Sequence, residues 1–260
     1  MVSYLFNFEN IILLGLLASL VAGLATGVGA IPIFFTRNIS KNLMDILLGF
    51  AAGVMLAATS FSLIIPALET AGGGVKAAAI VLGGILIGGI FLDKVDTFFP
   101  DTNLLKGPGK NHDNLRRAWL FAAAITIHNF PEGLAVGVGF GNGDIANGLS
   151  LAIAIGLQNM PEGLAVALPL LREGLDSWKV FLIALGTGLV EPVGGLIGVG
   201  LVQIAAPLLP WALAFAAGAM LFVISHEIIP EAHKNSASKA STHALLIGFV
   251  IMMFLDNVLG

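Results

Sequence analysis

Two nearly identical nine-residue motifs carry residue types that bind metal ions. One begins at His128 and reads HNFPEGLAV; the other begins at Gln158 and reads QNMPEGLAV, with seven of nine positions identical. In a helix, residues four apart share a face, so His128 stands over Glu132 and Gln158 over Glu162. An imidazole nitrogen with carboxylate and amide oxygens, without sulfur, suits Zn²⁺ and also Fe²⁺, Mn²⁺ or Cd²⁺.

The remaining polar positions of the motifs add to this donor set. Asn129 and Asn159 lie about 100° around the helix, where their amides reach an adjacent position. Pro131 and Pro161 each lack a backbone N–H and so release a carbonyl one turn earlier. Within a membrane such freed backbone is tolerated where it lines a cavity or finds partners.

Composition places these motifs in a membrane. The chain has 260 residues, of which 57% are hydrophobic and 11% charged, and its mean hydropathy is +0.95. Soluble domains carry about 25% charged residues, so this chain lacks the side chains for a water-facing surface. The absence of cysteine excludes disulfides and thiolate sites, and the net charge of −4 does not favour a nucleic-acid partner.

The apolar segments predict an all-α polytopic membrane protein with eight spans, a single transmembrane domain over residues 1–260. A β-barrel is excluded because the segments are continuously apolar and do not alternate. The predicted spans are residues 9–35, 43–68, 76–92, 118–140, 147–171, 179–203, 210–230 and 243–258.

Basic residues predict the orientation, with both termini extracellular or periplasmic and a cytoplasmic loop at 94–117, in the plasma (inner) membrane. Eleven of the twelve basic residues fall on one side, which the positive-inside rule assigns to the cytoplasm, and Lys76 is the exception. The eleven are Arg37, Lys41, Lys94, Lys106, Lys110, Arg116, Arg117, Arg172, Lys179, Lys234 and Lys239.

Depth decides how the carboxylates are interpreted. His128 and Gln158 lie about eleven residues, or roughly 16 Å, inside their spans, and Glu191 lies about as deep. Each unpaired charge there costs at least ~2.5–3.5 kcal/mol, and no lysine or arginine lies at that depth. The glutamates are therefore either protonated and hydrogen-bonded at helix kinks or neutralised by cations. Two adjacent motifs plus Glu191 favour cations.

The doubled motif also predicts two metal ions. Glu132 and Glu162, on neighbouring helices, can bridge two ions about 3.5–4 Å apart. His128 and Gln158 complete one site. The other site is completed by Asn129, Asn159 and Glu191.

The chain contains an inverted repeat. The segment FAAGVML at Phe50 matches FAAGAML at Phe215, and FLDKV at Phe91 matches FLDNV at Phe254. The first three spans thus resemble the last three, an odd number of spans later, so the copies face opposite ways, as in secondary transporters. A shorter match pairs Leu20-Val21 with Leu189-Val190.

Polar residues continue from the site toward the predicted cytoplasmic side. We expect Asp45, His226, Glu227 and Glu231 to form a metal exit path. An enzyme is not expected and no catalytic residue or catalytic cofactor is assigned, because HEIIPE has Pro230 where H-E-x-x-H needs its second histidine. A proton or anion channel explains buried glutamates but not the His, Asn and Gln donors.

With these motifs the chain resembles the ZIP (zinc- and iron-regulated transporter-like) family, and most closely its prokaryotic GufA-like branch. The resemblance covers nearly the whole chain and includes LGFAAGVMLA, both PEG motifs, the Glu-Pro after Val190, SHEIIPEAH and the last FLD. It implies a 3+2+3 arrangement of spans, uptake of a divalent metal, most often Zn²⁺, and movement of spans 1, 4, 5 and 6 relative to the others. Faces of small residues are compatible with a homodimer.

The resemblance also implies the ligand sets. It adds Met55 near the first metal and makes Glu132 and Glu162 common to both metals. Asn159 stands where some relatives have Asp, so the second site loses a carboxylate. The implied first set is His128, Glu132, Gln158 and Glu162, and the second is Asn129, Glu132, Asn159, Glu162 and Glu191.

Overall fold

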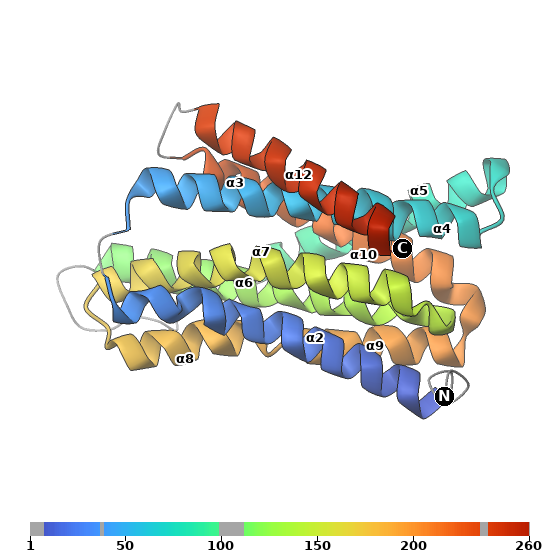
Figure 1. Cartoon of the computed structure of the whole chain (residues 1–260), viewed down its shortest axis with the longest axis horizontal. Helices are drawn as coiled ribbons and strands as arrows, with labels where there is room; N and C mark the ends of the chain where they lie inside the picture. Colours follow the sequence, from blue (N-terminus) through green and yellow to red (C-terminus); the bar gives the residue numbers. More distant parts are fainter. Residues whose placement is uncertain (1–7, 37–38, 99–111, 235–238, 260) are drawn as a thin grey trace.

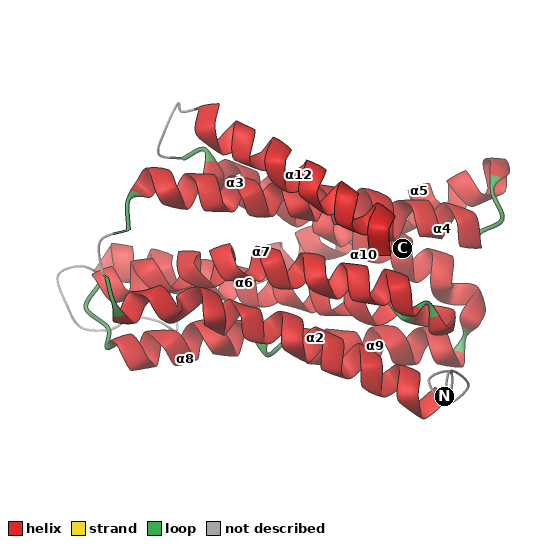
Figure 2. Cartoon of the chain, viewed as in Figure 1, coloured by secondary structure: helices red, strands yellow, loops and turns green. Residues whose placement is uncertain are grey.

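The computed structural model describes residues 8–36, 39–98, 112–234 and 239–259, and every regular element in them is helical (Figure 2). Residues 99–111, most of the predicted loop at 94–117, lie outside the described residues, as does Arg37. The rest of that predicted loop is helical, because the flanking helices extend into it.

The long helices overlap the eight predicted spans. Several spans are built from consecutive short elements. In chain order these are α2 (Phe8–Ala30), the 3-10 turn η1 (Ile31–Phe34), α3 (Lys41–Ala58), the π-helix η2 (Thr59–Ile64), α4 (Ile65–Thr70), α5 (Gly74–Phe98), α6 (His112–Gly139), η4 (Gly141–Gly143), α7 (Ile145–Arg172), α8 (Ser177–Gly188), α9 (Glu191–Ile204), η5 (Ala206–Leu208), α10 (Leu209–Val223), the π-helix η6 (Ile224–Ile228), α11 (Ile229–Ala232) and α12 (Lys239–Leu259).

Seven helical segments in the described residues are long and apolar enough to cross a membrane. The eighth long helix, α6, has 28 residues and carries the polar His128 motif and a charged first turn, which lower its hydropathy. The protein is therefore an all-α, multi-pass membrane protein.

The helices form two groups that meet along one seam (Figure 1). In one group α2 packs against α7, α8 and α9, and α6 packs against α9 and α7; in the other α3 packs against α12, and α5 against α10. Contacts of α7 with α3 and of α6 with α10 join the groups. The start of α2 and the end of α12 lie at the same end of the bundle (Figure 1).

Close backbone contacts in the first group come in two matching sets. At the α2–α7 crossing, a Cβ on Gly163 would collide with the Thr26 carbonyl, and one on Gly29 with the Met160 carbonyl. Only glycine lets backbones approach so closely.

The α6–α9 crossing repeats this arrangement. Here Gly133 meets the Glu191 carbonyl and Gly194 meets the Phe130 carbonyl. The two motif glycines therefore occupy equivalent positions, and a pseudo-two-fold axis relates α2 to the α8–α9 pair.

These contacts define the register of the repeat. Thr26 and Glu191 are 165 residues apart, the same separation as Phe50 and Phe215. The match of Leu20-Val21 with Leu189-Val190 is wrong in register, because it implies a separation of 169. The close glycine contacts fix how the two copies of the repeat align. A match of only two residues carries no information about that alignment.

The second group has the same symmetry. Gly53 packs on the Leu245 carbonyl, and its counterpart Gly218 packs on the Ile85 carbonyl. Ile85 and Leu245 are 160 residues apart, whereas the two FLD segments are 163 apart. The FLD segments are therefore three residues out of structural register.

Both π-helices lie at equivalent places. Thr59 begins η2 and Ile224 begins η6, again 165 residues apart. Pro66 and Pro230 follow them, and a proline ring clashes with the carbonyl four residues earlier while donating no hydrogen bond. The helix widens there, which is typical of functional sites.

The span expected at 179–203 is interrupted. Its two helices, α8 and α9, are separated by Leu189 and Val190, because Pro192 donates no hydrogen bond to α8. Glu191 becomes the first residue of α9, where the helix dipole stabilises a carboxylate.

We predict that Gly53→Ala destabilises the protein by about 1–3 kcal/mol, because the added methyl overpacks the α3–α12 crossing. Thermal unfolding in detergent, followed by circular dichroism, measures this. Gly200→Ala is the matched control, since a Cβ there meets nothing within 4 Å. Equal melting temperatures for the two variants would contradict the packing described.

Candidate metal centre

Seven of the predicted ligands come together between three helices. Each is at most 2% exposed, although all are polar. They are His128, Asn129 and Glu132 on α6; Gln158, Asn159 and Glu162 on α7; and Glu191 on α9. The close crossings at Gly133 and Gly163, directly after two of the glutamates, bring α6 onto α9 and α7 onto α2.

Two amide–carboxylate hydrogen bonds join the helices at this site. Gln158 Nε2 donates to Glu132 Oε1 at 2.5 Å, which links α7 to α6. Asn159 Nδ2 donates to Glu191 Oε1 at 2.6 Å and to the Ala22 carbonyl at 2.8 Å, which links α7 to α9 and α2. The Gln158–Glu132 pair belongs to the first predicted ligand set, and the Asn159–Glu191 pair belongs to the second.

His128 is held by a residue of the other helix group. Its Nε2 lies 2.6 Å from Glu227 Oε1 of η6, and its Nδ1 has no hydrogen-bond partner. Metal-binding histidines commonly place the second ring nitrogen against a carboxylate, which fixes the ring orientation. Nδ1 is thus the nitrogen available to a metal.

The centre is rich in acceptor atoms that no protein donor satisfies. Buried polar atoms are usually hydrogen-bonded, and each exception needs an explanation. All seven residues have at least one such buried atom. These are His128 Nδ1, both side-chain polar atoms of Asn129, Glu132 Oε2, Gln158 Oε1, Asn159 Oδ1, Glu162 Oε1 and Glu191 Oε2.

The carboxylates also lack a basic partner. Glu132 interacts electrostatically with Glu191 and with Glu162, and Glu162 with Glu227. In the described part of the chain, no lysine or arginine forms an ion pair with the three site glutamates. Neighbouring like charges in a low-dielectric interior favour a bound cation.

The predicted sites draw on amide oxygens as well as carboxylates and imidazole. Among the described residues, no group of three or more His, Asp and Glu side chains is arranged to hold a metal ion. The predicted sites therefore also include the side-chain oxygens of Gln158, Asn129 and Asn159, each of which lacks a hydrogen-bond partner.

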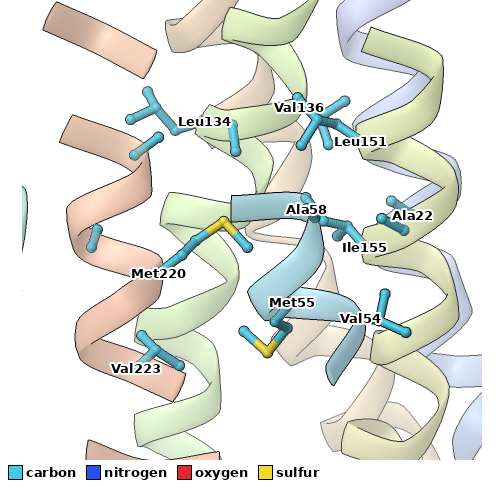
Figure 3. Close-up of a cluster of buried hydrophobic side chains, with 14 of the residues drawn as sticks. Ala22, Val54, Met55, Ala58, Leu134, Val136, Leu151, Ile155, Met220 and Val223 are labelled. Carbon is cyan, nitrogen blue, oxygen red and sulfur yellow. The ribbon is translucent and has the colours of Figure 1, made fainter. Parts of the chain in front are cut away.

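Met55 lies on a different helix from the seven. It is fully buried on α3 and belongs to the hydrophobic cluster that contains Ala58, Ile155 and Met220 (Figure 3). Its thioether therefore lies in apolar surroundings.

The four residues expected in the exit path occupy different places. Glu227 contacts His128, whereas Glu231 lines a cavity of about 440 Å³ between α3, α6, α7 and α11. His226 is exposed, and its ring lies beside that of Phe222. It lines a groove between α5 and α10. Asp45 is buried one turn before Gly49, on the face of α3 that packs against Ser241 of α12, and does not line that cavity.

Comparison with known proteins shows the family. A family model described as ZIP Zinc transporter matches residues 105–256, a range that includes all seven predicted ligands. The chain belongs to the ZIP family.

Among similar ZIP proteins is the zinc transporter GufA of Myxococcus xanthus, 47% identical over 251 residues, with 95% of this chain and 99% of the relative covered. The zinc transporter ZIPB of Bordetella bronchiseptica is 44% identical, with 91% and 78% covered. The human zinc transporter ZIP11 is 36% identical, with 90% and 94% covered.

Sequence reasoning missed two features of this ZIP protein's centre. It placed Glu227 on the exit path and did not foresee its bond to His128, because the contact depends on the packing of η6 against α6. It also passed over Thr26, whose buried hydroxyl has no partner. Thr26 precedes Glu191 by 165 residues, the separation that also relates Phe50 to Phe215, and this spacing is the sequence signal that points to Thr26.

We predict that Glu227→Gln lowers zinc affinity about 10–100-fold, since it weakens the bond that orients His128. Isothermal titration of detergent-purified protein with Zn²⁺ measures the affinity. Glu231→Gln, four residues later and half-buried in the cavity, should leave it unchanged. A rise in affinity for Glu227→Gln would show instead that Glu227 competes with the metal for His128.

Proposed function

We propose that this protein transports Zn²⁺, and also Fe²⁺, Mn²⁺ or Cd²⁺, across a membrane toward the cytoplasm. The observation that carries the proposal is the set of seven buried ligands whose acceptor atoms have no protein donor. The relatives named as zinc transporters, 44–47% identical, support the choice of metal. Since these relatives are transporters, the cation is cargo and not a catalytic cofactor.

The centre holds two metal ions bridged by Glu132 and Glu162. The separate pairings of Gln158 with Glu132 and of Asn159 with Glu191 support two donor groups. His128 completes the first group and Asn129 the second. Bridging carboxylates balance the charge of two adjacent cations.

Release takes place into the 440 Å³ cavity. Ala165 lines it, three residues beyond Glu162, and its rim carries Lys41, Arg172 and Lys234. These basic residues support the proposal that this end faces the cytoplasm and that both termini lie outside. Glu231 and Glu173 are the carboxylates that line the cavity, and Lys234 pairs with Glu231 at 2.9 Å.

The division into two helix groups supports transport by alternating access. The group containing α2, α6, α7, α8 and α9 carries the seven ligands, and sliding it along α3 and α10 exposes the metal to either side. An inverted repeat supports this, since its two halves provide equivalent inward and outward contacts. The His128–Glu227 bond crosses the seam, so it must break during each movement.

Purified protein in liposomes loaded with a zinc-sensitive dye tests transport. We predict saturable Zn²⁺ entry that falls at least about tenfold in Glu162→Ala, because a bridging ligand is lost. Glu173→Ala, on the rim of the cavity, serves as control. Unaffected entry in Glu162→Ala would place the route elsewhere, and zinc binding without entry would favour a sensor or a membrane enzyme.

A second prediction concerns stoichiometry. The wild-type protein should bind two Zn²⁺ per chain, and Glu191→Gln only one, because the second metal loses its own carboxylate. Asn159→Asp should tighten the second site by restoring a charged oxygen. Metal analysis after equilibrium dialysis counts the ions, and a single ion in the wild type would contradict the binuclear centre.

A further inference from the structure

Thr26 differs from three other described threonines in the membrane-spanning helices. Thr59, Thr126 and Thr187 each donate a hydrogen bond to a backbone carbonyl in the preceding turn. Thr26 is 1% exposed, and its Oγ1 has no hydrogen-bond partner. In an apolar environment, a threonine hydroxyl without its usual hydrogen bond to the backbone costs free energy. The direction of the Thr26 hydroxyl therefore requires an explanation.

The hydroxyl points away from its own helix. The carbonyl one turn earlier, on Ala22, accepts a hydrogen bond from Asn159 Nδ2 at 2.8 Å. A Cβ built on Gly188 would lie 2.7 Å from Thr26 Oγ1. Thr26 therefore faces the interruption between α8 and α9, next to the metal centre.

Pseudo-symmetry makes Thr26 the counterpart of Glu191. The two flank the crossing of Gly23 and Gly188, and a Cβ built on Gly23 would lie 3.4 Å from Glu191 Cβ. Gly133 packs on the Glu191 carbonyl as Gly163 packs on that of Thr26.

The two halves of the centre differ in how these counterparts are bonded. Asn159 is hydrogen-bonded to Glu191, whereas neither polar atom of Asn129 has a partner. The half that contains Thr26 and Asn129 therefore holds three unsatisfied polar atoms with no net charge.

We propose that the Thr26 hydroxyl is a further oxygen donor of the metal centre, acting beside Asn129 as Glu191 acts beside Asn159. The divalent ion, or a water bound to it, fills the space between the hydroxyl and the amide. The charged oxygens of Glu191 then face the neutral hydroxyl of Thr26 across the pseudo-two-fold axis, while Glu132 and Glu162 contribute one carboxylate to each side. This inference rests on the proposed metal transport.

Thr26→Val removes the hydroxyl at nearly constant volume and tests the proposal. Titration of the purified protein with Zn²⁺ should show an affinity about tenfold lower, and Thr26→Ser should restore it. Thr187→Val is the matched control, because that buried hydroxyl is bonded to the Ala184 carbonyl. Thr26→Ala replaces Thr26→Val if the latter does not fold, as judged by its melting temperature.

A double-mutant cycle separates a donor from a packing residue. In an Asn129→Ala background, Thr26→Val should cause little further loss of zinc affinity, because the two groups act together; in a Gln158→Ala background, which removes a donor of the other group, the losses should add. Wild-type affinity in Thr26→Val, failure of Thr26→Ser to restore binding, or addition in both backgrounds would overturn the proposal. Zinc binding that depends on Glu162 but not on Thr26 would leave the transport function standing, whereas no zinc binding by the wild type would overturn both.

Discussion

Burial of three glutamates without a basic partner is the constraint on which the rest of this structure depends. In a low-dielectric interior, like charges repel and unsatisfied oxygens lose their hydration, so such a cluster persists only if something positive compensates it. Amides from α7 donate to Glu132 and Glu191, but each carboxylate retains an oxygen without a donor. The helices are thus arranged around a cluster of carboxylates whose remaining oxygens have no protein donor among the described residues.

Glycine makes this arrangement possible. Without a hydrophobic driving force between membrane helices, association depends on close packing, and small residues permit the closest approach. Gly133 and Gly163 bring α6 onto α9 and α7 onto α2, and each directly follows a site glutamate. The same motif therefore supplies both the ligand and the contact that positions it.

The pseudo-two-fold symmetry is followed closely by the backbone and broken by the side chains. Crossings, π-helices and motif glycines all repeat, yet His128 corresponds to Gln158 and Thr26 to Glu191. Charge is consequently unequal in the two halves of the centre. Within the centre, α6 alone is tied across the seam by the His128–Glu227 bond, so one half is coupled to the neighbouring helix group.

The sequence by itself determined the membrane class and the helical segments, and it predicted as ligands seven polar residues that the fold buries. Hydropathy reports burial in lipid directly, and polar residues at such depth are too costly to be incidental. The i, i+4 spacing of His128 and Glu132 is a local property of a helix, so it needed no tertiary information.

Only the tertiary structure decided the register of the repeat, the interruption before Glu191 and the partners of individual atoms. Short identities such as FLD do not report register, because glycine contacts between distant helices set it. The bond of Glu227 to His128 and the orientation of Thr26 depend on how η6 and α8 pack. The residues expected in the exit path lie apart for the same reason. His226 and Glu227 are neighbours in η6, but their side chains face different helices.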